Sequence, residues 1–248
     1  MSPYCSAVRL GLISDLHGNL LALEAVLEDL ERAGIDRLVC LGDVAAGPEP
    51  RATIERLREL ACPVVVGNWD CWLLEGTPPL PGEEGPKLRD QGDWSAAQLG
   101  EAEQAFLAEL PPYVEINLDG AAVLCVHGSP RSNTDDIHAT TPDGELAEML
   151  AGTEPAFLAA GHTHVQLARQ HGATLIVNPG SVGQPFAQWW PKTIRVAPWG
   201  EYGVIDASSG WLQVDLRRVP FDVQKLLRFC RESGMPHAKW WVDSWNAE

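Results

Sequence analysis

The chain has 248 residues, of which 45% are hydrophobic, and this length and composition are typical of a globular protein with a large buried core. It carries 34 acidic and 18 basic residues, for a net charge of −16. That balance argues against a surface that follows a long nucleic-acid backbone, which would need stripes of Lys and Arg. A small phosphorylated ligand is not excluded, because bound metal ions can create a local positive potential in an acidic protein.

The compartment is predicted from what the sequence lacks. Its N-terminal residues do not resemble a signal peptide, and no apolar run is long enough to span a membrane. The six cysteines form no C-x-x-C pair, and two of them lie inside apolar runs. We therefore expect a cytoplasmic protein with reduced thiols and no association with membranes.

The first half of the chain alternates between strand-like and helix-like patterns. An apolar run over 8–13, a helical stripe over 20–33 that ends at Gly34, and a second apolar run over 38–41 predict a β-α-β unit. A further helix is expected over 51–60, and a short strand over 64–66. The stretch Gly76 to Gly92 is rich in Pro, Gly and charge and is predicted to be a loop near the site. A helix over 95–110 with Ser95 as its cap is predicted to follow.

The second half is richer in strands of the antiparallel type. Two runs separated by Asp119-Gly120 predict a hairpin, and a helix is expected from Pro142 to Ala151. Further strands are predicted over 156–160, 165–169, 174–177, 202–206 and 211–219, with a closing helix over 222–233. No repeat or linker divides the chain.

Five of the apolar runs end directly in residue types that bind divalent metals. In a largely parallel sheet, the carboxyl ends of the strands open onto one crevice, so these endings are predicted to converge on one site. The candidate ligands are Asp15, His17, Asp43, Asn68, His127, His162 and His164. Such mixed oxygen and nitrogen ligands suit manganese, iron, zinc, nickel or cobalt better than calcium.

Seven ligands are more than one ion needs, whereas two ions that share a bridging carboxylate would use them all. Paired metals about 3.5–4 Å apart are a common device for the hydrolysis of phosphate esters. The pattern therefore predicts a binuclear centre at the carboxyl ends of the strands.

The order of the motifs resembles the calcineurin-like metallophosphoesterase superfamily, and within it the compact bacterial and archaeal branch. The resemblance is carried by Asp15-x-His17, Gly42-Asp43, Gly67-Asn68-x-Asp70, Val126-His127-Gly128, Gly161-His162-Thr163-His164 and the stretch from Asn178 to Pro185. It implies an α/β fold in the form of a four-layer α-β-β-α sandwich with two mixed sheets, as a single domain over 1–248. It also implies two divalent ions, with manganese favoured and iron, zinc, nickel, cobalt or magnesium as alternatives.

The resemblance also implies a role for each ligand. Asp15, His17, Asp43 and His164 would hold the first ion, and Asp43, Asn68, His127 and His162 the second, with a metal-bridging hydroxide as the nucleophile. One position departs from the family pattern, since Trp69 stands where many members have a histidine that helps protonate the leaving group. Trp69 therefore favours a substrate whose leaving group needs little help, or a proton supplied by another group such as His138.

Several other polar residues have two readings. Asn19 is either the cap of the helix that follows or a contact for substrate or metal-bound water, and Arg131 is either a phosphate-binding side chain or an ordinary surface arginine. Asp70 is expected to support the ligands, and Asn178 and Ser181 to order the loop beside them. Of the ten tryptophans, Trp189, Trp190 and Trp199 are candidates for stacking on a base, while Trp240, Trp241 and Trp245 are expected to anchor the C-terminal tail.

The predicted function is that of a metal-dependent phosphoric ester hydrolase. Its expected substrate is a small phosphodiester, a nucleotide or a dinucleoside polyphosphate, and a homodimer is possible. A phosphoprotein (Ser/Thr) phosphatase is the alternative, which would need an open groove. A metal-binding scaffold without catalysis is the third reading, and it would predict eroded ligands, whereas all seven positions are filled.

Overall fold

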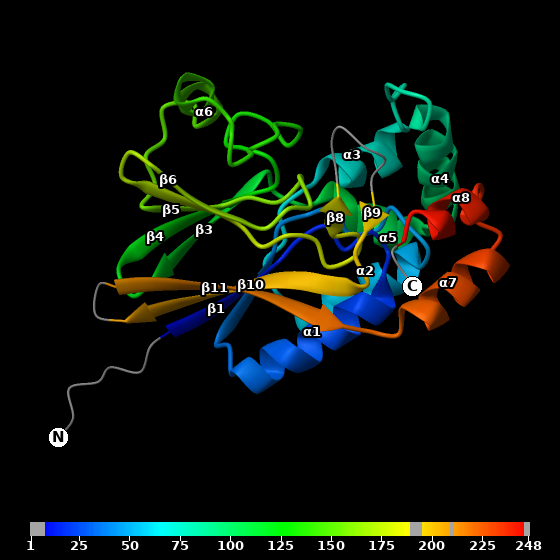
Figure 1. Ribbon diagram of the computed structural model, residues 1–248, viewed down its shortest axis with the longest axis horizontal. Coiled ribbons are helices and arrows are strands. Elements are labelled where there is room, and N and C mark those ends of the chain that lie inside the picture. Colours follow the sequence, from blue (N-terminus) through cyan, green and yellow to red (C-terminus); the bar gives the residue numbers. More distant parts are fainter. Residues whose placement is uncertain (1–7, 189–194, 209–210, 246–248) are drawn as a thin grey trace.

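The computed structural model describes residues 8–188, 195–208 and 211–245, which form two mixed β-sheets with helices around them (Figure 1). The first sheet has the strand order β11-β10-β1-β2 and contains β1 (Val8–Ile13), β2 (Arg37–Cys40), β10 (Trp199–Ser208) and β11 (Trp211–Pro220). The second has the order β3-β4-β5-β7-β6 and contains β3 (Tyr113–Leu118), β4 (Ala121–Val126), β5 (Phe157–Ala159), β6 (Leu167–His171) and β7 (Thr174–Asn178). A separate two-stranded ribbon pairs β8 (Phe186–Gln188) with β9 (Arg195–Val196).

The β-α-β unit at the N-terminus has the predicted form. Strand β1 pairs in parallel with β2, and the connection between them is helix α1 (Leu20–Ala33). The side chain of Asn19 accepts a hydrogen bond from the backbone N–H of Ala22 and so caps the first turn. Gly34 ends the helix in the left-handed conformation, with a φ of 66°.

The two sheets face one another across an apolar core. Each sheet contributes alternate side chains to this core, including Leu10 and Leu12 from β1 and Phe157 and Ala159 from β5, all completely buried or nearly so. The outer face of the first sheet packs against α1, α2 (Pro50–Leu60) and α5 (Glu101–Ala108). Helix α6 (Asp143–Met149) packs on the outer face of the second sheet, so the predicted four-layer α-β-β-α order is confirmed (Figure 1).

Three predicted elements differ from the structure. The stretch Gly76 to Gly92 is not a loop throughout, because α4 (Gly85–Ala97) begins inside it. Ser95 is therefore no cap: it lies in α4, where its hydroxyl bonds to the backbone of Gly47. The run 64–66 makes only an isolated bridge, between Val64 and Cys40, rather than a strand.

Two helices around the site have no counterpart in the prediction. Helix α3 (Asn68–Glu75) begins inside the Gly-Asn motif, and α8 (Ala238–Asp243) follows the predicted closing helix, which is α7 (Val223–Glu232). The aromatic side chains of Trp241 and Trp245 are buried with α7, their ring centroids 5.1 Å apart, as expected for residues that anchor the C-terminal segment. No helix in the described parts of the chain is both long and apolar enough to cross a membrane.

Candidate metal centre

The predicted ligands come together at one edge of the two sheets. Asp15 and His17 follow β1, Asp43 follows β2, Asn68 opens α3, His127 follows β4, and His162 and His164 follow β5. Six of them form two groups within which the ligand atoms all lie within 4.8 Å of one another. The first group is Asp15, His17 and His164, and the second is Asp43, His127 and His162.

Five of these residues have a backbone conformation that L-amino acids rarely adopt. Asp15, His17, Asp43, His162 and His164 have φ values between 45° and 68°. The conformation turns each chain segment sharply at the end of its strand, so that the side chain faces the neighbouring segments. Backbone strain of this kind is maintained only where the surroundings enforce it, and it clusters at functional sites.

Three imidazole rings are oriented by the backbone. The Nδ1 atoms of His17, His127 and His164 lie 3.2, 2.7 and 2.8 Å from the carbonyl oxygens of Ala46, Leu41 and Gln184, respectively. A carbonyl can only accept, so each Nδ1 carries the proton and donates it. In the neutral ring the Nε2 atom is then left with a lone pair that points into the centre, which is the arrangement that metal-binding histidines require.

Each of the two carboxylates uses one oxygen for the protein and turns the other toward the imidazoles. Asp15 Oδ2 accepts hydrogen bonds from Ser14 Oγ and from the backbone N–H of His162. Asp43 Oδ1 accepts from the backbone N–H of Trp69. The second oxygens, Asp15 Oδ1 and Asp43 Oδ2, lie 3.3 Å from His164 Nε2 and 3.4 Å from His127 Nε2.

Asp70 supports the turns that carry these ligands, as expected. One of its oxygens accepts from the backbone N–H groups of Asp43 and Gly67, and the other accepts from Val44, each at 2.9 Å. The two metal-binding motifs are thereby tied together. Gly67 itself must be small, because a Cβ atom there would lie 2.1 Å from Asp43 Oδ1.

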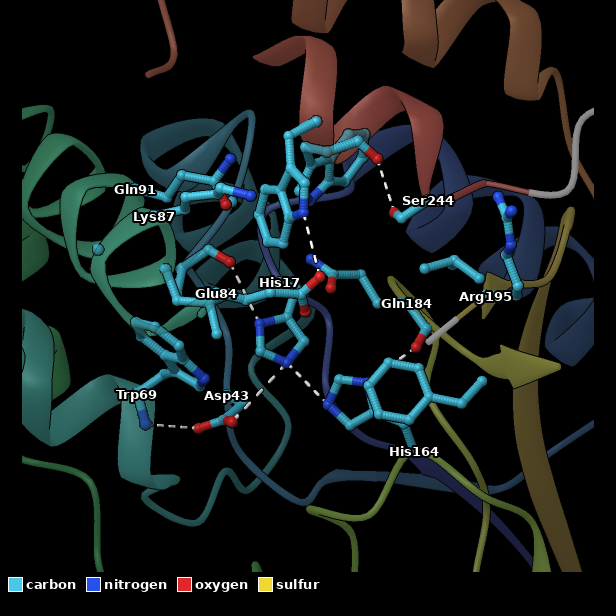
Figure 2. A pocket seen from close by; sticks show the side chains of 18 of the residues that line it. His17, Asp43, Trp69, Glu84, Lys87, Gln91, His164, Gln184, Arg195 and Ser244 are labelled. Atoms are coloured by element: carbon cyan, nitrogen blue, oxygen red, sulfur yellow. Dashed lines mark hydrogen bonds and ion pairs between the residues drawn. The ribbon is translucent and has the colours of Figure 1, made fainter. Parts of the chain in front are cut away.

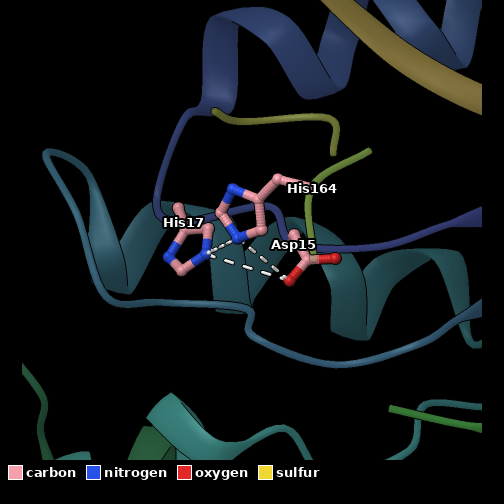
Figure 3. Close-up of side chains that lie close together, drawn as sticks. All are labelled: Asp15, His17 and His164. Carbon is pink, nitrogen blue, oxygen red and sulfur yellow. Dashed lines mark hydrogen bonds and ion pairs between the residues drawn. The ribbon is translucent and has the colours of Figure 1, made fainter. Parts of the chain in front are cut away.

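The donor set fits divalent cations. Asp15 Oδ1 is buried and has no hydrogen-bond partner among the described residues, and His17 Nε2 lies 3.0 Å from His164 Nε2, so that neutral rings with their protons on Nδ1 direct two lone pairs at each other (Figure 3). A buried acceptor without a donor is costly, and two facing lone pairs repel each other. A cation bound by all three atoms removes both penalties. In the second group, Asn68 Oδ1 lies 3.1 Å from His127 Nε2 and adds a neutral oxygen ligand.

The charges of the site are strongly coupled. Burial disfavours the charged form of His127, but the attraction of Asp43 and then Asp15 outweighs it and raises the pKa of His127 to about 10. Burial, together with repulsion from His164, lowers the pKa of His17 to about 4. Burial also opposes the ionisation of Asp15, yet the surrounding histidines, His164 first, hold the pKa of Asp15 well below its usual range.

A cavity of about 510 Å³ opens above the centre (Figure 2). Its floor, meaning the residues at the metal centre that face the cavity, consists of His17, Asp43, Trp69, His162 and His164. One side, the α4–α8 wall, consists of residues from helices α4 and α8 and the segment just before α4: Glu84, Lys87, Leu88, Gln91, Gly92, Trp240, Trp241 and Asp243. The ribbon β8–β9 adds Phe186, Arg195 and Val196.

A model of the calcineurin-like phosphoesterase superfamily domain matches residues 8–197, which is more than half of the chain. The chain belongs to the calcineurin-like phosphoesterase superfamily. It is therefore an enzyme of the class that hydrolyses phosphoric esters. The match ends before β10 begins, although β10 and β11 belong to the same sheet as β1.

Similar calcineurin-like phosphoesterases occur in bacteria and archaea. The phosphodiesterase YfcE of Escherichia coli is 28% identical over 190 residues, which cover 72% of this chain and 81% of that protein. The crystal structure of a metallophosphoesterase from Sphaerobacter thermophilus is 29% identical and has a TM-score of 0.74, with 96% of this chain and 99% of that chain covered. A hypothetical protein from Pyrococcus horikoshii shares the fold, with a TM-score of 0.76 at 23% identity over 93% of this chain and 95% of that chain.

Other candidate residues lie away from the floor of the phosphoesterase cavity. Asn19 is fully buried and uses its side chain on Ala22 and on the carbonyl of Gly183, so the structure assigns it the capping role rather than a substrate contact. Arg131 makes a bidentate ion pair with Asp135 and does not line the cavity. The structure therefore supports the interpretation of Arg131 as an ordinary surface arginine. Neither does His138, whose backbone N–H donates to Thr141 Oγ1.

The loop after β7 has an ordering role, as predicted. Asn178 donates to the carbonyl of Gly161, and Ser181 donates to the carbonyl of Asp15, so both fix the segments that carry ligands. Trp199 does not line the cavity, because its indole N–H bonds to Glu201 while Arg218 lies 5.0 Å over its ring. Trp189 and Trp190 lie outside the described residues.

The wall residues of the phosphoesterase cavity were not predicted as functional. Lys87 and Gln91 lie in the stretch that was predicted to be a loop beside the site, with none of its residues singled out, and α8 lies more than 70 residues beyond the last ligand motif. No spacing or motif connects these segments. The cluster of tryptophans near the C-terminus indicated packing rather than contact with a substrate.

Proposed function

We propose that this protein is a divalent-metal-dependent phosphodiesterase that hydrolyses a small phosphorylated substrate. The observation that carries the proposal is the buried, unpartnered Asp15 Oδ1 beside two imidazoles whose Nε2 atoms face each other, at the floor of a cavity. This combination of donors is suited to a transition metal rather than to a structural hydrogen-bond network. Of the possible metals, we favour manganese.

The site would hold two ions. Asp15, His17, Asp43 and His164 would bind the first, and Asp43, Asn68, His127 and His162 the second, with Asp43 shared between them. When bound, such ions activate water and neutralise the charge that develops on the phosphate. Sharing is supported by the position of Asp43 Oδ2, which lies 3.8 Å from His17 Nε2 in one group and 3.4 Å from His127 Nε2 in the other.

The chain's own residues would position the ions and exclude water. The carbonyl partners of His17, His127 and His164 hold the rings so that little rearrangement is needed on binding. His162 is the most exposed of the four imidazoles and lines the cavity, which places it between the centre and an incoming phosphate. Trp69 also lines the floor, with its ring centroid 6.5 Å from that of His17, and it covers the centre with apolar surface.

Trp69 bears on the identity of the leaving group. An indole N–H does not act as a general acid, and the other described residues of the floor are the candidate metal ligands. The leaving group would therefore depart without a proton from Trp69, which favours a phenolate, a nucleotide or a phosphate oxygen over a simple alcohol. His138, the other predicted donor, does not line the cavity and so is not placed to supply the proton.

The shape of the site separates the alternatives. A phosphoprotein phosphatase would need a groove open to a loop of another protein, whereas here the α4–α8 wall and the β8–β9 ribbon flank the floor. A scaffold without catalysis has no need for seven filled ligand positions, five of them held in strained conformations. The relatives named as phosphodiesterase support the proposal that this protein is a phosphodiesterase. A small phosphorylated substrate, a cytoplasmic location and a homodimer remain predictions.

The test is hydrolysis by metal-stripped protein that has been reconstituted with manganese. Bis-p-nitrophenyl phosphate and p-nitrophenyl phosphate are compared, with Asp43→Asn as the inactive control. We expect manganese-dependent cleavage, with the diester preferred and the variant inactive. Cleavage of the monoester alone would contradict the diesterase assignment, and no cleavage of either ester by protein with two bound ions would favour the scaffold reading.

A further inference from the structure

The cavity is larger and more elaborate than a single phosphate group requires. Its volume of about 510 Å³ is in the range of pockets that enclose whole small molecules, and a phosphate at the floor would leave most of it unfilled. The remaining space is bounded by the α4–α8 wall and by β8–β9. The part of the substrate beyond the scissile phosphate must be recognised there.

The α4–α8 wall is held together by contacts within the chain. The amide of Gln91 donates to the carbonyl of Pro236, which ties α4 to the segment before α8. The indole N–H of Trp240 donates to Glu84 Oε1, and the ammonium group of Lys87 lies 5.0 Å from the centroid of the Trp240 ring. Lys87 is thus held at the surface of the cavity by an aromatic ring rather than by a carboxylate.

A second cation lies across the cavity. Arg195 is on β9, and its guanidinium donates to the backbone carbonyl of Asp243 at the end of α8. Figure 2 shows Lys87 with Gln91 on one side and Arg195 on the other, with His17 and His164 between them. In the described parts of the chain, no carboxylate oxygen lies within 4 Å of the charged groups of Lys87 or Arg195.

Cations without acidic partners are notable inside a cavity of a protein with a net charge of −16. Most described arginines are paired with carboxylates, as Arg9, Arg56 and Arg131 are. Other described cations without a carboxylate partner, such as Arg58, do not line the cavity, whereas Lys87 is half-buried in its wall and Arg195 lines it although its side chain is exposed. Within a cavity, such cations are suited to bind an anionic group of a ligand.

We propose that the cavity binds a diphosphate ester that carries a planar ring, and that the scissile bond is the bridge between its two phosphates. One phosphate would lie at the floor, and Lys87 and Arg195 would bind the second. The ring would lie among the aromatic side chains of the cavity, which are Trp69, Phe186, Trp240 and Trp241. This inference rests on the proposed function and narrows its substrate class.

The chemistry agrees with the tryptophan at position 69. In hydrolysis of a diphosphate, the oxygen of water bonds to the phosphorus at the floor, and the bond from that phosphorus to the bridging oxygen breaks. The electron pair stays on the second phosphate, which leaves as an anion, and the proton of water passes to solvent. A phosphate oxygen has a pKa of about 6, so it leaves without protonation at neutral pH. A general acid in place of Trp69 is then unnecessary.

The first test measures binding to the manganese-loaded protein by titration calorimetry, with ADP and inorganic phosphate as ligands. We expect ADP to bind at least about tenfold more tightly than phosphate, because a charge-assisted contact typically contributes a tenfold factor or more. Lys87→Gln and Arg195→Gln should each weaken the binding of ADP by about tenfold, while the binding of phosphate is weakened less. Lys225→Gln and Arg58→Gln are matched controls, since neither residue lines the cavity, and both should bind as wild type does.

The second test compares kcat/KM for diadenosine diphosphate and bis-p-nitrophenyl phosphate, with thermal melting used to confirm that each variant is folded. Loss of the preference for the diphosphate in the two cavity variants supports the proposal. Equal ADP affinities in wild type and both cavity variants would overturn it, even if the esters are cleaved. If no ester is cleaved, the proposed function fails, while the ADP titration still decides whether the second phosphate has a site.

Discussion

The floor and the α4–α8 wall of the cavity are built in different ways. In the metal centre, part of which forms the floor, the rings of His17, His127 and His164 are held by backbone carbonyls, and five candidate ligands occupy the left-handed region of φ. In the wall, the contacts are made by side chains on two helices, such as Trp240 with Glu84 and Lys87. Of the five floor residues, His17, Asp43 and His164 are buried, whereas Trp69 and His162, like Lys87 and Trp240 in the wall, are half-buried.

This difference separates chemistry from selectivity. A floor held by backbone contacts keeps its geometry when surface residues change, because it depends on the course of the chain at the ends of strands. A wall held by side chains can bind a different ligand after a few substitutions, while the fold is retained. Changes to the floor should therefore alter metal binding and turnover, and changes to the wall should alter which substrate is bound.

The largest expected effect comes from Asp15→Asn. The amide oxygen can still accept from Ser14 and His162, so its NH₂ group would donate to His164 Nε2 where a cation would otherwise bind. Loss of a partner of a metal ligand already costs about 10–100-fold in affinity or activity. We therefore expect more than about a 100-fold loss of turnover and of metal content, measured by kinetics and elemental analysis. The wall variant Trp240→Leu should retain its metal. An equal loss of metal in both variants would contradict the idea that the wall acts on substrate selection alone.

Asp70→Asn tests the support of the floor. The amide NH₂ group would then face either the backbone N–H of Val44 or those of both Asp43 and Gly67, so at least one of the three backbone donors would lose its acceptor. A buried donor left without a partner costs about 1–3 kcal/mol. We expect metal affinity to fall by about 10–100-fold and the melting temperature to drop. Asp93→Asn, at an exposed position on α4, is the control, and wild-type affinity in Asp70→Asn would show that the tie between the motifs is dispensable.

Metal affinity should also depend on pH. In the metal-free protein, attraction by Asp43, acting against burial, raises the pKa of His127 to about 10, so His127 is protonated at neutral pH. A metal must displace this proton, and affinity should increase as pH rises toward the pKa, by about tenfold per pH unit from this residue. Calorimetric titrations at pH 7 and 8, in buffers of different ionisation enthalpy, measure the affinity and the protons released. A metal affinity that is the same at pH 7 and pH 8 would contradict the coupling between metal binding and loss of the His127 proton.

The smallest effect is expected from Asn19→Ala, which removes a helix cap without touching the floor. Loss of a cap costs about 1 kcal/mol, and the hydrogen bond to Gly183 is lost as well. We expect the free energy of unfolding to decrease by about 1–2 kcal/mol, with metal content unchanged, as measured by denaturant titration and elemental analysis. A large loss of metal in this variant would instead support a direct role of Asn19 at the centre.

Helix α1 and the hairpin β3–β4 show which elements could be predicted. The stripe of α1 and its two end signals, Asn19 and Gly34, are local, and Asp119-Gly120 forms its turn from neighbouring residues. Helix α3 could not be predicted in this way, because it begins within a ligand motif and its first turn is fixed by Asp70. The run 64–66 resembles a strand, yet it has only one bridge to β2.

The metal ligands could be identified from the sequence, because ligands placed at the ends of consecutive strands converge once those strands form parallel neighbours, as β4 does with β5 and β1 with β2. The α4–α8 wall could not be identified in this way. Lys87 and Trp240 meet because two helices far apart in the chain pack side by side, and no periodicity or motif encodes that contact. The residues proposed to select the substrate therefore become visible only in the folded molecule.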